Sequence, residues 1–141
     1  MWQWIAQFLG LSGRRDAGSR GEKHAADWLE RERGYSVVTR NWRSPRDRRD
    51  EIDLVCRDGE VLVFVEVKAR AAGALVPGYY AVDQRKKRVM RRAIDAYLRQ
   101  LAPAPRTFRF DVVEVAHRAD GAAPEVLHFE NIPLFPKHYR P

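Results

Sequence analysis

Apolar residues recur at helical spacing over residues 20–33, and they share one helix face with Glu22. Ser19 comes directly before this stretch and Glu22 three residues later, which is the pattern of a capping box at a helix start. Gly34 suits the C-terminal end of a helix. We therefore predict a helix over 20–33, preceded by a polar connection over 12–20.

The rest of the pattern changes between strand-like and helical segments. Alternating, β-branched stretches predict strands, and an apolar stripe with a period of 3.6 residues predicts a second helix. An Asp-Gly dipeptide between two such stretches is a strong hairpin signal. In order, we expect strands over 35–42, 51–57 and 60–69, a helix over 83–101, and strands over 107–116 and 125–132. This order, αβββαββ, predicts an α/β fold with one mixed sheet flanked by helices.

The length of 141 residues predicts a single folded domain. We place it at residues 18–134, after an apolar helix and linker over 1–17 and before a tail over 135–141. The first segment lacks the basic start and cleavage site of a signal peptide, and no run approaches the roughly 18 apolar residues of a membrane span. The single cysteine, Cys56, rules out an internal disulfide. A cytoplasmic location is therefore expected.

Basic residues outnumber acidic ones. The chain has 26 Lys and Arg against 19 Asp and Glu, a net charge of +7, and a pI near 10.0. This balance favours a polyanionic partner, with nucleic acid first. The sequence contains no HExxH, P-loop or nucleophile-elbow motif, which argues against zinc hydrolases, nucleotide-driven enzymes and serine hydrolases.

Acidic side chains gather at one end of the predicted hairpin. With a two-residue turn, Asp53 lies opposite Phe64 and diagonal to Glu66, with the two acidic residues' backbones roughly 7 to 8 Å apart. Both carboxylates share a face with Lys68. Neighbouring acids repel each other, and a divalent cation removes that cost. The spacing therefore predicts a cation site between the two strands.

Mg²⁺ binds oxygen ligands, often one or two carboxylates together with a substrate phosphate, as in phosphodiester hydrolysis. We predict that Asp53 and Glu66 bind the metal, that Lys68 stabilises charge or orients water, and that Glu22 is a fourth catalytic residue. Two alternatives stay open. The first three residues also fit an ion-pair ladder on a half-exposed sheet, and Glu22 also fits the structural role of a capping box.

The same residues resemble a family signature. The sequences over 51–55, 63–70 and 109–113, together with Gly21-Glu22, are similar to the bacterial YraN family. The resemblance implies a restriction-endonuclease-like fold with the PD-(D/E)xK nuclease core, which also occurs in archaeal Holliday junction resolvases. It further implies that the backbone carbonyl of Val67 faces the metal. Nucleases with this core commonly act as homodimers because two strands must be cut.

Two positions depart from the family pattern. Asp50 stands where the family usually has glycine, and Ala69 stands where it usually has threonine. Asp50 adds a negative charge near the expected site. It either tunes metal binding or caps the loop that precedes the second strand.

Two basic segments flank the acids, one in the loop before Asp53 and one at the start of the second helix. We expect them to bind a phosphate backbone, although a solvated basic surface is an equally common use of such residues. Lys86 alone lies on the inward stripe of its helix. The predicted nucleic-acid-binding residues are Arg43, Arg46, Arg48, Arg49, Arg85, Lys86 and Lys87.

These patterns together predict an endonuclease or resolvase-like enzyme that depends on Mg²⁺ or Mn²⁺. Because the sequence has no base-reading motif, recognition of structured or branched DNA is favoured over recognition of sequence. RNA is a less favoured substrate. The alternative is a non-catalytic nucleic-acid-binding module that keeps the nuclease fold.

Overall fold

The computed structural model describes residues 11–71 and 83–140, which form one five-stranded sheet and two helices. The strands lie in the order β1-β2-β3-β4-β5, and only the β3–β4 pair is parallel. The elements are α2 (Leu11–Arg33), β1 (Ser36–Arg43), β2 (Glu51–Asp58), β3 (Val61–Ala71), α3 (Gln84–Arg99), β4 (Phe108–His117) and β5 (Glu125–Phe129). The predicted α/β fold with a mixed sheet is confirmed, and it is consistent with a restriction-endonuclease-like core.

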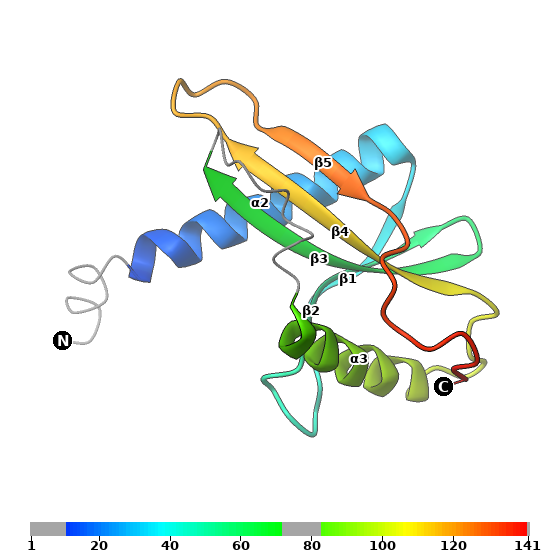
Figure 1. Cartoon of the computed structure of the whole chain (residues 1–141). Coiled ribbons are helices and arrows are strands. Elements are labelled where there is room, and N and C mark those ends of the chain that lie inside the picture. Colours follow the sequence, from blue (N-terminus) through cyan, green and yellow to red (C-terminus); the bar gives the residue numbers. More distant parts are fainter. Residues whose placement is uncertain (1–10, 72–82, 141) are drawn as a thin grey trace.

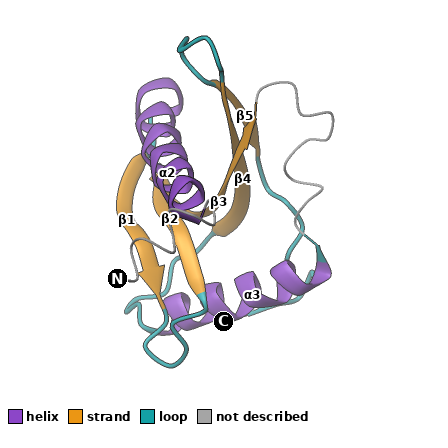
Figure 2. Cartoon of the chain, turned by 90° about the vertical axis from the view of Figure 1, so that its left-hand side faces the viewer, coloured by secondary structure: helices purple, strands orange, loops and turns teal. Residues whose placement is uncertain are grey.

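The two helices cover different parts of the sheet. Figure 1 shows α2 behind the long strands β3 and β4, and Figure 2 shows α3 across one end of the strands. Each helix has its own hydrophobic core. Alternate residues of β3 separate the two cores, because Phe64 packs with the α3 residues and Val63 and Val65 pack with the α2 residues Ala25 and Leu29.

The connection predicted over residues 12–20 is wrong. The chain is helical from Leu11 onward, so α2 is one continuous helix of 23 residues. Ser19 and Glu22 therefore lie inside the helix, and the capping box does not exist. Two glycines, Gly18 and Gly21, misled the sequence prediction because glycine lowers helix propensity. Residues 1–10 of the predicted N-terminal helix lie outside the described part of the chain.

The predicted second helix is confirmed as α3. The Asp83 carboxylate accepts a hydrogen bond of 2.8 Å from the Lys86 backbone N–H and caps the helix start. Its buried residues follow the 3.6-residue period that the sequence predicted, and they are Met90, Ala93, Ile94, Tyr97 and Leu98. Between β3 and α3, residues 72–82 of the predicted loop lie outside the described range.

The C-terminal segment packs against the end of the sheet. The last strand is shorter than predicted and ends at Phe129, because the chain turns at Asn131, which has a positive φ of 55°. Leu134 is buried in the core under α3, and Phe135 stacks on Tyr139 with ring centroids 4.2 Å apart. Among the described residues, no helix has the length and apolar character needed to cross a membrane.

Candidate functional site

The β2–β3 hairpin brings the predicted acids closer together than expected. Its register pairs Asp58 with Val61 and Leu54 with Val65. The predicted register is wrong by two residues, because the turn begins at Gly59, whose φ is +57°. A shift of two keeps every side chain on its predicted face. Continued by one pair, the observed register sets Asp53 opposite Glu66 instead of diagonal to it.

The Asp53 side chain bridges the two strands just beyond the Leu54 pair. Its Oδ2 accepts a hydrogen bond of 2.8 Å from the backbone N–H of Val67. Burial and the neighbouring Glu66 charge raise the pKa of Asp53 to about 8, although the Val67 hydrogen bond works in the other direction. The ionised carboxylate is therefore destabilised in this place, and a cation close to it would stabilise that form.

Glu66 is the buried centre of the cluster, with only 4% of its surface exposed. Its Oε1 lies 3.3 Å from Nζ of Lys68 and 3.0 Å from Nζ of Lys86. Its Oε2 is buried and has no hydrogen-bond partner among the described residues. A buried, unpaired carboxylate oxygen is costly and points to a ligand.

Glu22 approaches the same acids from α2. Burial, together with the charges of Glu51 and Glu66, raises its pKa, while a hydrogen bond with the Asn41 side chain opposes that change. Because Glu22 lies inside a helix, the capping role that competed with a catalytic one no longer applies. The structure thus brings Glu22, Asp53, Glu66 and Lys68 into one electrostatic cluster.

Asn41 and Lys86 belong to this cluster in ways that the sequence did not reveal. Asn41 lies in β1 with a positive φ of 50°, a conformation that asparagine tolerates better than most residues. In the sequence, the sign of this role was an asparagine within a predicted strand rich in β-branched residues. Lys86 was predicted to lie inward but was assigned to phosphate binding, whereas its ammonium contacts Glu66.

The acids fit a divalent cation through a small set of oxygen donors. No group of three or more His, Cys, Asp or Glu side chains within the described ranges is arranged to hold a metal. Mg²⁺ does not require such a group, since it commonly binds one or two carboxylates and keeps several waters. Asp53 and Glu66, whose Oε2 has no hydrogen-bond partner among the described residues, are two carboxylates of the kind that such a site needs.

The other predicted nucleic-acid-binding residues lie around the acids without joining them. Two of these arginines are paired, Arg43 at the end of β1 with Glu51 at 3.2 Å and Arg49 in the following loop with Asp47 at 2.9 Å. Arg46, Arg48 and Arg85 are exposed, and Lys87 is half-buried. Their exposed positive charges are of the kind that a phosphate backbone binds.

Asp50 organises the loop before β2. It is 5% exposed, and its carboxylate accepts hydrogen bonds of 2.8 and 3.2 Å from the Arg92 guanidinium. Its backbone C=O accepts from the Ser44 N–H at 3.0 Å, and its N–H donates to the Asp47 C=O at 2.9 Å. The sequence left two roles open for Asp50, tuning of metal binding and capping of the loop, and these contacts support the role in the loop.

Comparison with known proteins places the chain in a family. The model of "Uncharacterised protein family UPF0102" matches residues 21–115, a range that includes all the acids above. The chain belongs to the UPF0102 family. This assignment confirms the resemblance to the YraN family. A UPF0102 protein of Anaeromyxobacter dehalogenans is 47% identical over 118 residues, which cover 83% of each chain.

Two further UPF0102 proteins show the same extent of similarity. The one from Beutenbergia cavernae is 45% identical over 106 residues, covering 75% of this chain and 86% of the relative. The one from Geobacter metallireducens is 38% identical over 117 residues, covering 83% of this chain and 91% of the relative. The similarity therefore extends over most of the domain and is not limited to the hairpin.

Proposed function

We propose that this protein is a metal-dependent endonuclease that hydrolyses phosphodiester bonds in structured or branched DNA. The observation that carries the proposal is the unpaired Oε2 of buried Glu66, which lies across the hairpin from the Asp53 carboxylate. Two lysines border the pair, and the protein has a net charge of +7. An acidic centre within a basic surface suits a cation and a polyanion together.

Asp53 and Glu66 would hold Mg²⁺ or Mn²⁺, with the Val67 carbonyl as a further ligand by analogy with the family. When bound, the metal supplies Lewis-acid polarisation of the phosphoryl group and makes water more acidic. Lys68 remains beside Glu66 and stabilises the negative charge that develops on the phosphoryl oxygens. Glu22, held by Asn41, accepts a hydrogen bond from the attacking water and orients it.

A second function is favoured by one observation. Oε1 of Glu66 already has two ammonium partners, so the cluster has internal counter-charges without a metal. This arrangement also suits a binding module that retains the fold and binds nucleic acid without cutting it. The two functions are distinguished by cleavage: the nuclease cuts and needs Asp53 to do so, whereas the binding module does not cut.

Cleavage of a labelled substrate panel tests the proposal. The panel contains duplex, single-stranded, flap and four-way-junction DNA and a structured RNA, each with Mg²⁺, Mn²⁺ or EDTA. We expect metal-dependent cleavage of a branched DNA, reduced at least about 100-fold in Asp53→Asn and Glu66→Gln. Asp120→Asn is the matched control, because Asp120 is an exposed acid paired with Arg118 at the β4–β5 turn.

Two other outcomes of this experiment separate the alternatives. Tight, salt-sensitive binding without cleavage under either metal would leave the binding module. Preferential cleavage of the RNA would change the substrate class but leave the proposed hydrolysis of a phosphodiester bond unchanged.

We also propose a homodimer, since cutting both strands requires two centres. Light scattering on the protein with and without DNA measures the oligomeric state directly.

A further inference from the structure

A groove of about 530 Å³ separates the loop before β2 from the outer side of α3. The loop provides one wall and the C-terminal half of α3 the other. It is lined by Ser44, Pro45, Arg46, Asp50, Arg92, Asp95, Ala96, Arg99 and Gln100. None of the residues assigned to the acidic cluster lines it, so the groove is a separate feature from the candidate metal centre.

Polar contacts order the residues that line the groove. The carboxylate of Asp50 fixes the Arg92 guanidinium through two hydrogen bonds, and this ion pair ties the loop to α3. Further along α3, Asp95 accepts hydrogen bonds from Arg99 at 2.7 Å and from the Tyr139 hydroxyl. These contacts use only part of each guanidinium, since arginine has five N–H donors. Arg92 and Arg99 therefore keep donors for a ligand.

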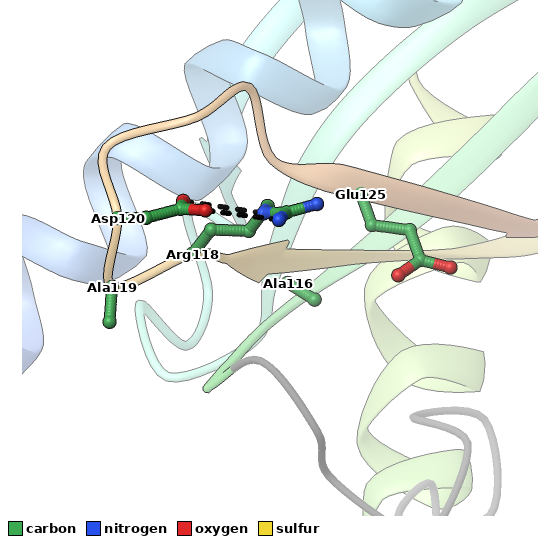
Figure 3. Close-up of a pocket in the computed structure, with 5 residues that line it drawn as sticks. All are labelled: Ala116, Arg118, Ala119, Asp120 and Glu125. Atoms are coloured by element: carbon green, nitrogen blue, oxygen red, sulfur yellow. Dashed lines mark hydrogen bonds and ion pairs between the residues drawn. The ribbon is translucent and has the colours of Figure 1, made fainter.

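The charge of the groove suits an anion. Three guanidinium groups line it against two carboxylates, and the Arg46 guanidinium has no ion pair among the described residues. A smaller pocket at the β4–β5 turn has the opposite balance. Figure 3 shows it with one guanidinium, Arg118, paired to Asp120, and with Glu125 as a second carboxylate. Of these two sites, only the groove on α3 has a surplus of donors for a phosphate.

Helix α3 contacts the acidic cluster near its start and lines the groove with its C-terminal half. Lys86, which contacts Glu66, is six residues before Arg92 and thirteen before Arg99 on α3. A helical rise of 1.5 Å per residue places these arginines about 9 and about 20 Å from Lys86 along the helix axis. A DNA strand advances 3.4 Å per nucleotide. Along the axis, this separation corresponds to about three to six nucleotides. At about 100° per residue, Arg92 and Arg99 lie roughly 240° and 220° around the helix from Lys86, so the path of a strand is longer and the groove is at least about three nucleotides from the candidate centre.

We propose that this groove is a binding subsite for one nucleotide of the DNA strand, located at least about three nucleotides from the candidate metal centre. The phosphodiester contacts the guanidinium groups of Arg46 and Arg99, and the sugar lies against Pro45 and Ala96. Arg92 is a positioning residue whose role is to hold the loop through Asp50. The inference rests on the proposed nucleic-acid substrate and does not depend on catalysis.

Replacing single phosphates of the DNA with neutral analogues tests the proposed subsite. The probe is a fluorescein-labelled flap DNA in EDTA, in which one phosphate at a time is replaced by an uncharged methylphosphonate. Affinities are measured for wild type, Arg46→Gln, Arg99→Gln, Lys86→Met and Arg118→Gln. The last variant is a matched control, because Arg118 is also an exposed arginine paired with an aspartate and lies at the β4–β5 turn (Figure 3). Circular dichroism melting verifies that each variant is folded.

We expect Arg46→Gln and Arg99→Gln each to weaken binding about 3- to 10-fold and to lower the salt slope by about 1. Arg118→Gln should stay within about twofold of wild type. In wild type, two groups of sensitive phosphates should lie at least about three nucleotides apart. Arg46→Gln and Arg99→Gln should lose sensitivity at one group, and Lys86→Met at the other.

The outcomes separate the two proposals. If wild type binds the flap but Arg46→Gln and Arg99→Gln behave like the Arg118 control, the subsite is wrong and the proposed function stands. If the phosphate replacements show the two groups but the cleavage panel shows no cutting, the subsite stands and the nuclease is wrong. If wild type binds none of the nucleic acids at low salt, both are wrong.

Discussion

Nζ of Lys86 lies 3.0 Å from Oε1 of Glu66, so an ion pair joins α3 to the acids at the centre of the sheet. Contacts with Glu66 raise the pKa of Lys86 even though burial opposes that change. Lys86 is therefore the counter-charge of a buried carboxylate. This contact also fixes how α3, which lines the groove, is placed relative to the candidate metal centre.

Replacing Lys86 with methionine should destabilise the metal-free protein. Met retains most of the packing volume but leaves Glu66 with Lys68 as its remaining ammonium partner among the described residues. About a third of the Lys86 side chain is exposed, and water screens the pair, so the expected loss is only about 1 kcal/mol. Urea unfolding in EDTA measures it, with Lys87→Met as the neighbouring control. Equal stability of the two variants would contradict the ion pair's role.

Asp53→Asn should have the opposite effect on stability. The Asn side-chain oxygen can still accept from the Val67 N–H, while the repulsion between residue 53 and Glu66 disappears. We expect a gain of about 1 to 2 kcal/mol in the free energy of unfolding at pH 8 in EDTA.

Mg²⁺ should reverse the order of stability of wild type and Asp53→Asn. A cation that binds the native acids raises the unfolding midpoint of wild type by mass action and has less effect on Asp53→Asn. Thermal melts over a Mg²⁺ titration test this expectation. A loss of stability in Asp53→Asn without metal, or an equal response of both proteins to Mg²⁺, would contradict it.

Asp111, which is distant in sequence from the acidic cluster, should contribute strongly to the stability of the fold. Its fully buried carboxylate accepts hydrogen bonds from Arg109 Nε at 3.0 Å and the Asn131 N–H at 2.9 Å, and lies 2.8 Å from Nε2 of His128. Burial alone would raise its pKa, but these hydrogen bonds and the Arg109 charge lower it below its ordinary value of 3.8. Asp111→Asn should therefore cost about 3 kcal/mol of stability.

The same shift sets the sign of a pH dependence. Because the folded-state pKa of Asp111 is lowered, its contribution is complete above the unfolded value of 3.8 and is lost as pH falls through the folded value. Wild-type stability should decrease below pH 4, and Asp111→Asn should flatten that decrease. Unfolding curves between pH 7 and pH 2 measure the difference. Asp120→Asn, at an exposed position, should follow wild type.

The continuous helix α2 predicts different outcomes for substitutions at its two glycines. A Cβ added at Gly18 meets nothing within 4 Å, so Gly18→Ala should stabilise the protein by about 0.5 to 1 kcal/mol through helix propensity. A Cβ at Gly21 would lie 3.1 Å from Cβ of Ala69. Gly21→Ala should gain less or lose stability, because α2 must move away from β3. Equal gains would show that α2 is not packed closely at Gly21.

The sequence predicted the succession of strands along the chain and the faces of the hairpin because alternation and turn residues are local signals. It placed Asp53 and Glu66 on one face even though the register was wrong by two residues, since such an error preserves the face. The exact pairing depended on which two residues form the turn. Asp58 and Gly59 were the expected pair, but Asp58 instead pairs with Val61 as the last residue of the ladder.

Other parts of the site depended on contacts between distant segments. No local pattern showed that Asn41 in β1 would contact Glu22 in α2, or that Asp50 would hold Arg92. The start of α2 was missed because intrinsic propensity near Gly18 and Gly21 argued against a helix, whereas packing against β3 stabilises one. Tertiary contacts decided these features, and a single sequence does not display them.

Glu22 and Lys86 reach Glu66 from the two different helices. The arrangement therefore exists only after both helices have packed, because a hairpin alone would contain Asp53, Glu66 and Lys68 but neither Glu22 nor Lys86. A nascent or partly unfolded molecule would lack the assembled centre. Integrity of this centre is consequently a property of the whole domain, and amide exchange of Val67 should follow global unfolding instead of local opening.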